Sequence, residues 1–388
     1  MRLFALALAA FAVQTDDFVI IGVLPAIGRD LDVSTGAAGQ LVTVFTLVYA
    51  LAAPLSAVLL GRVDRRALLV GALLVFCAAN FVVPAVDAYP VLMALRVVAA
   101  LAAATVLPAV LALATHLAPD GAAGRHLATV MAGMTGAIVL GVPAGTWLGA
   151  ALGWRATFVL GGGLGALALV ALLRWLPRTS LAAPPSPRGL LTAPVRRILV
   201  VTVLAVAGNL AFQTYLATFL AGLSGVTPTA LGTLLVVAGL AGIAGARLAG
   251  TLVDRRGAHR AFGAAATAFA VTMVAFACCW LARPVPLWLT VGLLVAWSAT
   301  AWAVPPAIQA LMLDRAGREH ATAAMALVSS TVYVGAAAGG AAGGLLVGVT
   351  PGAVPVLAAA CAVAAVAWSA LPASRRRRPA DEPADARW

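Results

Sequence analysis

The feature that most constrains this chain is a series of twelve long apolar segments separated by short polar connections. A helix needs about 20 mostly apolar residues to cross roughly 30 Å of hydrocarbon, and each segment meets that length. Charged residues make up only 10% of the chain, whereas soluble domains carry about a quarter. We therefore predict an all-α integral membrane protein with twelve transmembrane helices. The segments run approximately over 3–25, 37–59, 67–86, 90–113, 127–150, 157–176, 198–222, 229–249, 261–281, 286–313, 321–346 and 354–372.

The longest polar stretch separates the sixth and seventh segments. It contains the run Ala183-Pro184-Pro185-Ser186-Pro187, and such proline-rich composition is typical of linkers. We expect an N-terminal six-helix bundle over 1–176, a cytoplasmic linker over 177–197, a C-terminal bundle over 198–372 and a basic cytoplasmic tail over 373–388.

Arginine is unequally distributed between the two sets of connections. With the N-terminus inside, 21 of the 25 basic residues lie on the cytoplasmic side, three lie outside (Arg29, Arg155, Arg283) and Arg96 lies within a segment. Short, positively charged loops stay in the cytoplasm, so both termini are predicted to be cytoplasmic. The alternative is that residues 1–12 belong to a cleaved signal peptide, which would leave eleven spans.

Other function classes find no support in the sequence. The formal charge of +12 comes from short clusters between apolar segments, so we expect no nucleic-acid partner. The cysteines lack metal-ligand or disulfide spacing, and the four histidines fall in polar connections. We therefore predict no enzyme, no catalytic residue, no metal and no cofactor. The four cysteines are Cys77, Cys278, Cys279 and Cys361.

An internal repeat links the two halves. The run Val63-Asp64-Arg65-Arg66 recurs as Val253-Asp254-Arg255-Arg256, in each case after the second segment of its half. This placement indicates duplication of a six-helix unit. Two interpretations stay open for both copies: topology control with helix capping, or a gating loop whose ion pairs hold the cytoplasmic side closed.

Four stretches together resemble one transporter family. They are Thr15-Asp16-Asp17-Phe18-Val19 with Gly22-Val23-Leu24-Pro25-Ala26-Ile27, the repeated loop, Arg96 in the fourth segment, and Gly141-Val142-Pro143-Ala144-Gly145 with Gly149 and Gly153-Trp154-Arg155. In these residues the chain resembles the major facilitator superfamily, and within it the twelve-span drug:proton antiporters that include arabinose-efflux-permease-like and chloramphenicol-resistance exporters. The first loop copy departs from the family pattern, having Ala67 after its basic pair and its glycine, Gly61, one place late.

The resemblance implies a fold and a function. It implies two six-helix bundles around a central cavity, in the cytoplasmic membrane of a bacterium. It also implies proton-driven efflux of small organic molecules, drug-like or antibiotic, by alternating access. The expected partners are a small-molecule substrate, protons and membrane lipid, and the protein is expected to be a monomer. Two alternatives remain: a proton-coupled or facilitated transporter of sugars or nucleosides, and a non-transporting membrane sensor.

Three charged residues are predicted to couple protons to transport. Asp16 and Asp17 lie well inside an apolar segment, where an ionised carboxylate is costly and usually serves ion or proton transfer. Adjacent residues point about 100° apart on a helix, so both cannot face a cavity equally. The resemblance favours Asp17, which precedes the aromatic Phe18. The alternative is that Asp16 only pairs with Arg96, which cannot shed its charge, as a fixed structural ion pair.

Small residues recur every fourth position in two segments, which allows two helices to approach closely. One stripe contains Gly133, Ala137, Gly141, Gly145 and Gly149, and the other contains Gly335, Gly339 and Gly343. Close packing alone accounts for such stripes. Pro143 also removes a helical hydrogen bond, and the resemblance makes Gly141, Pro143, Gly145 and Gly149 an antiporter-type helix.

Polar and aromatic residues within the apolar segments are the candidate cavity lining. A pocket with apolar walls and few polar groups suits uncharged or amphipathic small molecules. Pro305 and Pro306 are expected to break the tenth helix beside this cavity. The candidates are Gln14, Gln40, Asn80, Asn209, Gln213, Tyr215, Trp297, Trp302, Gln309 and Tyr333.

Overall fold

The computed structural model describes residues 1–59, 63–119, 123–176, 192–316 and 321–370. Twelve spans within these ranges are long and apolar enough to cross a membrane. The regular structure of the described ranges consists of helices. The predicted all-helical membrane architecture is therefore confirmed, and each predicted apolar segment corresponds to one helical span.

The N-terminal half contributes six spans. The fifth is built from two α-helices joined by a π-helical turn, η2. A short 3-10 helix, η1, follows α3. The bounds are α1 (Arg2–Asp30), α2 (Thr35–Leu59), α3 (Arg65–Val82), η1 (Val83–Ala85), α4 (Tyr89–His116), α5 (Ala123–Gly136), η2 (Ala137–Gly141), α6 (Val142–Leu152) and α7 (Arg155–Trp175).

The C-terminal half contributes the other six spans, of which the first is interrupted at Tyr215 between α8 and α9. The bounds are α8 (Ala193–Thr214), α9 (Leu216–Ser224), α10 (Pro228–Arg256), α11 (Ala258–Leu281), α12 (Leu287–Ala316), α13 (Ala321–Val347) and α14 (Ala353–Ala370). Helix α8 begins inside the predicted linker. The rest of that linker, 177–191, and the predicted tail lie outside the described residues.

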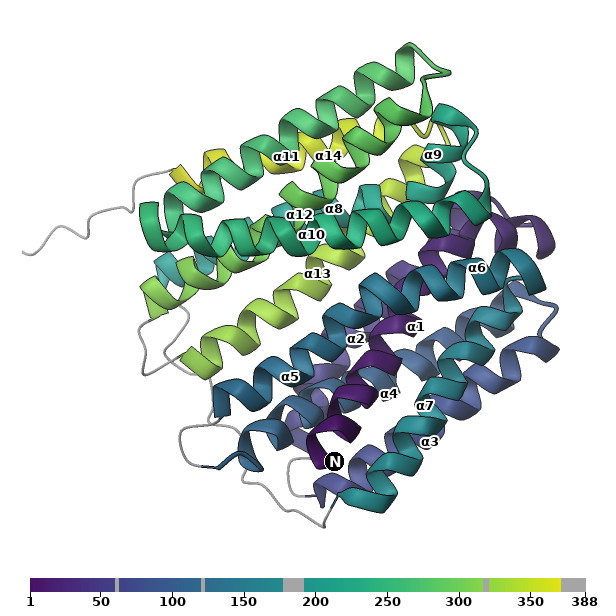
Figure 1. Cartoon of the computed structure of the whole chain (residues 1–388), viewed down its shortest axis with the longest axis vertical. Helices are drawn as coiled ribbons and strands as arrows, with labels where there is room; N and C mark the ends of the chain where they lie inside the picture. Colours follow the sequence, from purple (N-terminus) through teal and green to yellow (C-terminus); the bar gives the residue numbers. More distant parts are fainter. Residues whose placement is uncertain (60–62, 120–122, 177–191, 317–320, 371–388) are drawn as a thin grey trace, which may run out of the picture.

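Each half packs around its own hydrophobic side chains. In the N-terminal half, Leu73, Phe76 and their neighbours form one core cluster, and in the C-terminal half Phe212 and Phe276 lie in another. Figure 1 shows the two halves as separate groups of helices, with α10 and α13 along the boundary. There α13 packs against α2, and α10 packs against α6.

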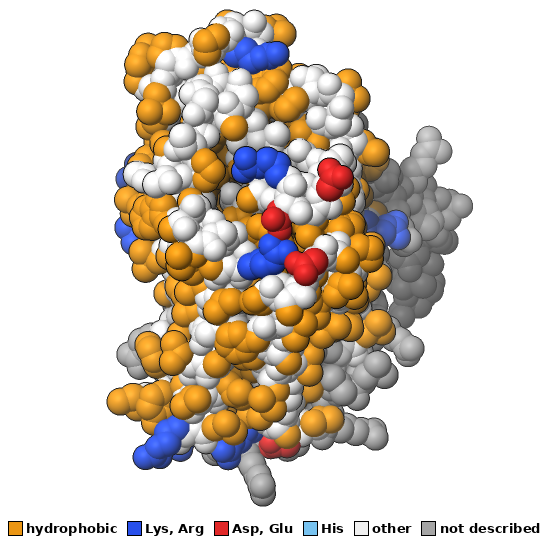
Figure 2. Space-filling model, turned by 90° about the vertical axis from the view of Figure 1, so that its right-hand side faces the viewer, with side chains coloured by type: hydrophobic (Ala, Val, Ile, Leu, Met, Phe, Trp, Pro, Cys, Tyr) orange, Lys and Arg blue, Asp and Glu red, His pale blue; other side chains and the backbone are white. Residues whose placement is uncertain are grey.

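The molecule has two ends, which we name by the connections they carry. The linker side is the end at which α1 begins, α7 ends and α8 begins; the opposite end, at which α1 ends and α2 begins, is the far side. Figure 2 shows the face that lies to the right in Figure 1, where hydrophobic side chains predominate and charged ones gather in small groups. Leu152 and Trp288 are 72% and 73% exposed, as expected of side chains that face lipid.

The first glycine stripe fixes the fifth span against α1. A methyl group added at Gly141 would overlap the side chain of Thr15, and one added at Gly145 would overlap Val19. At Gly149 the added methyl would meet Val23. Since these partners are four residues apart on α1, the stripe follows one face of that helix.

The second stripe fixes α13 against α8 in the same way. Gly335, Gly339 and Gly343 lie against Val203, Ala207 and Ala211. These three partners follow Thr15, Val19 and Val23 by a constant 188 residues. The two halves therefore repeat one packing unit. In this register the α8 positions equivalent to Asp16 and Asp17 are Leu204 and Ala205, so the acidic pair belongs to one half alone.

A methyl group added at Gly339 should destabilise this packing, because it would overlap the backbone carbonyl of Ala207. We expect Gly339→Ala to lower the free energy of unfolding by about 1–3 kcal/mol. Gly263→Ala in α11 is the matched control, since a methyl group there meets nothing within 4 Å. The control should be neutral or stabilising by up to roughly 1 kcal/mol, because alanine favours helix. Thermal unfolding in detergent measures both, and equal effects would contradict the packing argument.

Two proline predictions have different outcomes. Just before Pro143 the α-helix is interrupted by the π-helical turn η2, which ends at Gly141, and Pro143 lies in the first turn of α6. The predicted break at Pro305 and Pro306 was wrong, since α12 continues through both. Proline has a φ near −65°, which is helical, so its cost is the missing hydrogen bond and ring crowding rather than a change of direction. In a bundle, neighbouring helices can tolerate that cost.

Candidate functional site

The middle of α1 carries two buried carboxylates that face different partners. Asp16 is 0% exposed and Asp17 is 6% exposed. Asp16 forms an ion pair with Arg96 on α4, with 2.8 Å between Oδ2 and Nη1. Its other oxygen lies near Gly161 of α7. Asp16 therefore points into the N-terminal bundle, as the ion-pair alternative describes.

Two aromatic rings also lie against Arg96. Its guanidinium carbon lies 4.2 Å from the ring centroid of Phe45 and 5.9 Å from that of Phe158, both within cation–π range. Within the described residues, Nε and Nη2 of Arg96 and Oδ1 of Asp16 have no hydrogen-bond partner. Buried polar groups usually have partners, so this ion pair keeps hydrogen-bonding capacity in the core of the bundle.

Asp17 interacts electrostatically with Arg96 of α4, with Tyr49 of α2 and with Tyr333 of α13, so residues of both halves act on it. The two tyrosine rings stack with centroids 3.7 Å apart and an interplanar angle of 22°. Of the three predicted charged residues, Asp16 and Arg96 form an ion pair, and Asp17 interacts electrostatically with a tyrosine from each half.

The first of the predicted gating loops forms contacts within the N-terminal half. Asp64 caps α3, because its Oδ1 accepts a hydrogen bond from the backbone N–H of Ala67 at 2.9 Å. Arg66 donates from Nη2 to the carbonyl oxygen of Leu173, 2.7 Å away in the last turn of α7. Arg65 is buried. Capping at Asp64 is therefore confirmed.

The second copy differs from the expected cytoplasmic turn. Asp254, Arg255 and Arg256 lie in the last turn of α10, and α11 begins only after Gly257. Asp254 is therefore not the N-cap of the ninth span, and that prediction was wrong. Gly257 adopts a φ of +80°, which lets the chain reverse after Arg256. The two arginines instead lie where the helix dipole favours positive charge.

Polar candidates of the C-terminal half form a short chain of hydrogen bonds. Trp297 donates from Nε1 to Oδ1 of Asn209 at 3.1 Å, and Asn209 donates from Nδ2 to Oε1 of Gln213 at 3.4 Å. Trp302 packs against Gly242 of α10. Gln309 is exposed.

Of the other candidates, Tyr215 and Gln40 lie where the halves meet, and Gln14 and Asn80 are buried within the N-terminal half. Tyr215 is 1% exposed, donates to the carbonyl oxygen of Gly340 at 3.1 Å and packs against Gly39 of α2. Gln40 lies against Gly344 of α13. Gln14 is buried on α1, and its Oε1 has no partner among the described residues. Asn80, also buried, donates to the carbonyl of Phe76.

The contacts between the halves gather towards the far side. Gly36 lies directly against the backbone of Gly344, and Trp147 of α6 donates to the carbonyl oxygen of Thr229 at 3.2 Å. Both α2 and α10 begin on the far side, so Gly36 and Thr229 lie near that end. The two halves are therefore in contact near the far side in this conformation.

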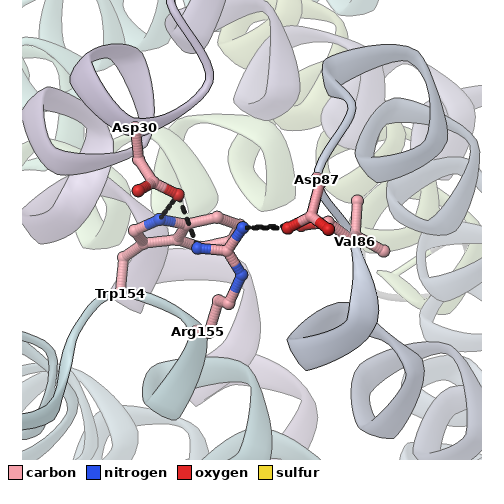
Figure 3. A network of polar contacts seen from close by, with 5 residues as sticks. All are labelled: Asp30, Val86, Asp87, Trp154 and Arg155. Carbon is pink, nitrogen blue, oxygen red and sulfur yellow. Dashed lines mark hydrogen bonds and ion pairs between the residues drawn. The ribbon is translucent and has the colours of Figure 1, made fainter.

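A polar network on the far side was not predicted as a site. Arg155 forms ion pairs with Asp30 at the end of α1 and with Asp87 before α4, and donates to the carbonyl oxygen of Val86 (Figure 3). Trp154 donates to the same oxygen of Asp30 at 3.0 Å. These contacts tie three connections of the N-terminal half together. The sequence did carry a signal for this network. Arg155 is one of the three arginines predicted outside, and Asp30 and Asp87 lie in connections predicted on the same side.

Tyr49 was also missed, although it meets the criterion that selected Tyr333, a polar aromatic residue inside an apolar segment.

No group of three or more His, Cys, Asp or Glu side chains suited to a metal occurs in the described ranges. The central chemistry available to this site is therefore that of Asp17, the Asp16–Arg96 pair and the tyrosines.

Comparison with known sequences points to transport. The family model of the Major Facilitator Superfamily matches residues 6–339 and 198–388. The chloramphenicol resistance protein of Streptomyces lividans is 38% identical over 267 residues, which are 67% of this chain and 68% of that protein. The uncharacterized MFS-type transporter YbcL of Bacillus subtilis is 31% identical over 312 residues, 79% of each chain.

Comparison with solved structures agrees on the fold. The structure of a D-xylose-proton symporter gives a TM-score of 0.77 at 14% identity, over 95% of this chain and 96% of the symporter. A bacterial homolog of the human lysosomal transporter Spinster, in an inward-facing and occupied conformation, gives 0.73 at 17% identity, over 95% and 93%. At such identities the likeness extends to the fold alone.

Proposed function

The chain belongs to the major facilitator superfamily, and from this premise we propose that it exports small organic molecules, drug-like or antibiotic, in exchange for protons. The observation that carries the proposal is the separation of the two carboxylates. Asp16 is engaged by Arg96, whereas Asp17 interacts electrostatically with Tyr49 and Tyr333, one from each half. A carboxyl group that moves protons must be reachable as the halves move, and the interactions of Asp17 with residues of both halves support that role.

The proposed cycle uses Asp17 as the proton carrier. With the far side open, Asp17 takes up a proton and substrate leaves. With the linker side open, Asp17 releases the proton and substrate binds. A ligand shifts a conformational equilibrium only through its different affinity for the two states, so proton and substrate must act on the same change.

We propose that the protein lies in the cytoplasmic membrane of a bacterium with its linker side in the cytoplasm. The arginine-rich connections support that orientation, since positive loops are retained inside. We assign the far-side contacts between the halves to a conformation that is closed towards the outside. No cofactor enters the proposal, because the proton gradient supplies the driving force.

The substrate class is proposed from the lining and from one relative. The polar chain Trp297–Asn209–Gln213 offers hydrogen-bonding groups without a formal charge, which suits uncharged or amphipathic molecules. The Streptomyces lividans relative is described as a chloramphenicol resistance protein, which supports antibiotic-like cargo.

Reconstitution into liposomes tests the proposal. We expect an imposed proton gradient to drive one class of compound from a panel of phenicols, other lipophilic drugs, pentoses and nucleosides, and a protonophore to abolish that movement. Movement that does not depend on the gradient would overturn proton coupling. Co-transport of a pentose or nucleoside with protons would instead support the importer alternative, and binding without exchange would indicate a sensor.

A further inference from the structure

A cavity of about 370 Å³ lies at the linker side, where α1 begins, α4 ends and α5 begins. These three helices pack against one another, and Figure 1 marks the N-terminus at this end of the N-terminal half. The volume falls within the range of small-molecule sites, roughly 300–1,000 Å³. None of the described lining residues belongs to the candidate substrate cavity or to the far-side network, so the proposed function does not account for this cavity.

The polar part of the cavity is basic. Arg2 at the start of α1 and His126 in the first turn of α5 both line it, and its described lining contains no acidic side chain. Nδ1 of His126 is buried and has no hydrogen-bond partner among the described residues. Buried polar groups usually have partners, so the cavity offers a guanidinium group and an imidazole nitrogen to a ligand. Negative charge is also favoured here because α1 and α5 both begin at this end.

The rest of the cavity is apolar. Leu6 of α1 and Ala114 of α4 are 0% exposed, and Leu3 and Leu117 line the cavity beside them. On the same turn of α1 as Leu3, the side chain of Phe4 is 59% exposed, as expected where a helix faces lipid. A free anion would leave the apolar walls against water, whereas a ligand with both an anionic group and an apolar chain covers both parts.

The level of the cavity in the membrane suits such a ligand. Because α1 begins at Arg2 and spans the membrane from there, Arg2 lies where the hydrocarbon gives way to lipid headgroups. Basic pockets between transmembrane helices at this level bind the headgroups of anionic lipids. A phospholipid of the leaflet on the linker side would bring its phosphate group to Arg2 and its acyl chain towards Leu6.

We propose that the cavity binds one anionic phospholipid, whose phosphate group is held by Arg2 and His126. The guanidinium group can donate two parallel hydrogen bonds to a phosphate, and the protonated Nδ1 of His126 donates another. The acyl chain lies against Leu3, Leu6 and Leu117. The lipid joins the start of α1, the end of α4 and the start of α5, so it stabilises the N-terminal half.

The test measures lipid binding to the full chain, purified in detergent with its affinity tag at the C-terminus so that Arg2 keeps its surroundings. Native mass spectrometry follows titrations with phosphatidylglycerol, which is anionic, and with phosphatidylcholine, which is zwitterionic. Arg2→Gln and His126→Phe each remove one contact of the phosphate group. Arg174→Gln is the matched control, because Arg174 is an exposed arginine at the linker-side end of α7 and does not line the cavity.

We expect the parent to bind one phosphatidylglycerol about tenfold more tightly than phosphatidylcholine. Each cavity variant should weaken that binding about tenfold, since a hydrogen bond to a charged group typically contributes at least this factor, whereas Arg174→Gln should bind like the parent. Phosphatidylglycerol should also raise the unfolding temperature of the parent and of Arg174→Gln more than that of either cavity variant, because a ligand that binds only the folded state stabilises it.

Three outcomes would overturn the proposal. Equal affinity for the two lipids would show that the cavity does not select an anionic headgroup, and an equal loss of binding in Arg174→Gln would show only a general effect of surface charge. If inorganic phosphate raises the unfolding temperature of the parent as much as phosphatidylglycerol does, the site belongs to a soluble phosphate compound instead. Should either cavity variant not fold, Leu117→Trp fills the cavity from the end of α4, and parent-like lipid binding there would overturn the inference as well.

Discussion

Asp17→Asn is expected to abolish accumulation of substrate against a proton gradient while leaving exchange of substrate across the membrane intact. Asparagine is close in size to aspartate but cannot bind and release a proton, so binding and conformational change are retained and the driving force is lost. The coupling between two ligands in one protein is typically worth a factor of roughly 5 to 150, and we expect a loss in that range. Transport in liposomes with and without an imposed gradient measures it.

Asp17→Glu is the control for this substitution, because it keeps a titratable carboxyl group in the same place. It should retain part of the gradient-driven transport. If Asp17→Asn transports as well as the parent, Asp17 has a structural role, and the coupling group must be sought at Asp16 or elsewhere.

Breaking the Asp16–Arg96 pair is expected to produce the largest loss of stability. Removing one partner of a buried ion pair typically costs about 3–5 kcal/mol, because the remaining charge is left unpaired. Arg96 is 1% exposed and cannot lose its proton, whereas an unpaired Asp16 can become neutral by taking one up. We therefore expect Asp16→Asn to destabilise the protein more than Arg96→Gln does.

The double variant Asp16→Asn with Arg96→Gln separates charge from packing. It leaves no buried charge at this place, so it should recover much of the stability that Asp16→Asn loses. Thermal unfolding in detergent, followed by a helix-sensitive signal, ranks the three variants. Equal stability of Asp16→Asn and the parent would show that the guanidinium is satisfied by its contacts with Phe45 and Phe158.

Several features of the fold follow from the sequence because they depend on local composition. Hydrocarbon selects for length and apolarity, so twelve spans could be identified from twelve apolar segments. The capping role of Asp64 depends on a residue three positions away. The glycine stripes predict close helix contacts because a spacing of four residues places side chains on one face. Even the unusual position of Asp16 and Asp17 is visible as charge within an apolar segment.

The sequence by itself therefore determined the membrane-spanning architecture, the duplication and the three charged residues within apolar segments for which we propose proton coupling. Only the tertiary structure decided which aspartate pairs with Arg96 and which does not. Asp16 and Arg96 are 80 residues apart, and nothing local to α1 chooses which aspartate meets Arg96. Tyr333 comes from the other half and stacks on Tyr49 only because α13 packs on α2. Apolar burial acts on each segment separately, whereas a pairing depends on the packing of all the helices together, and that information is not present in any one segment.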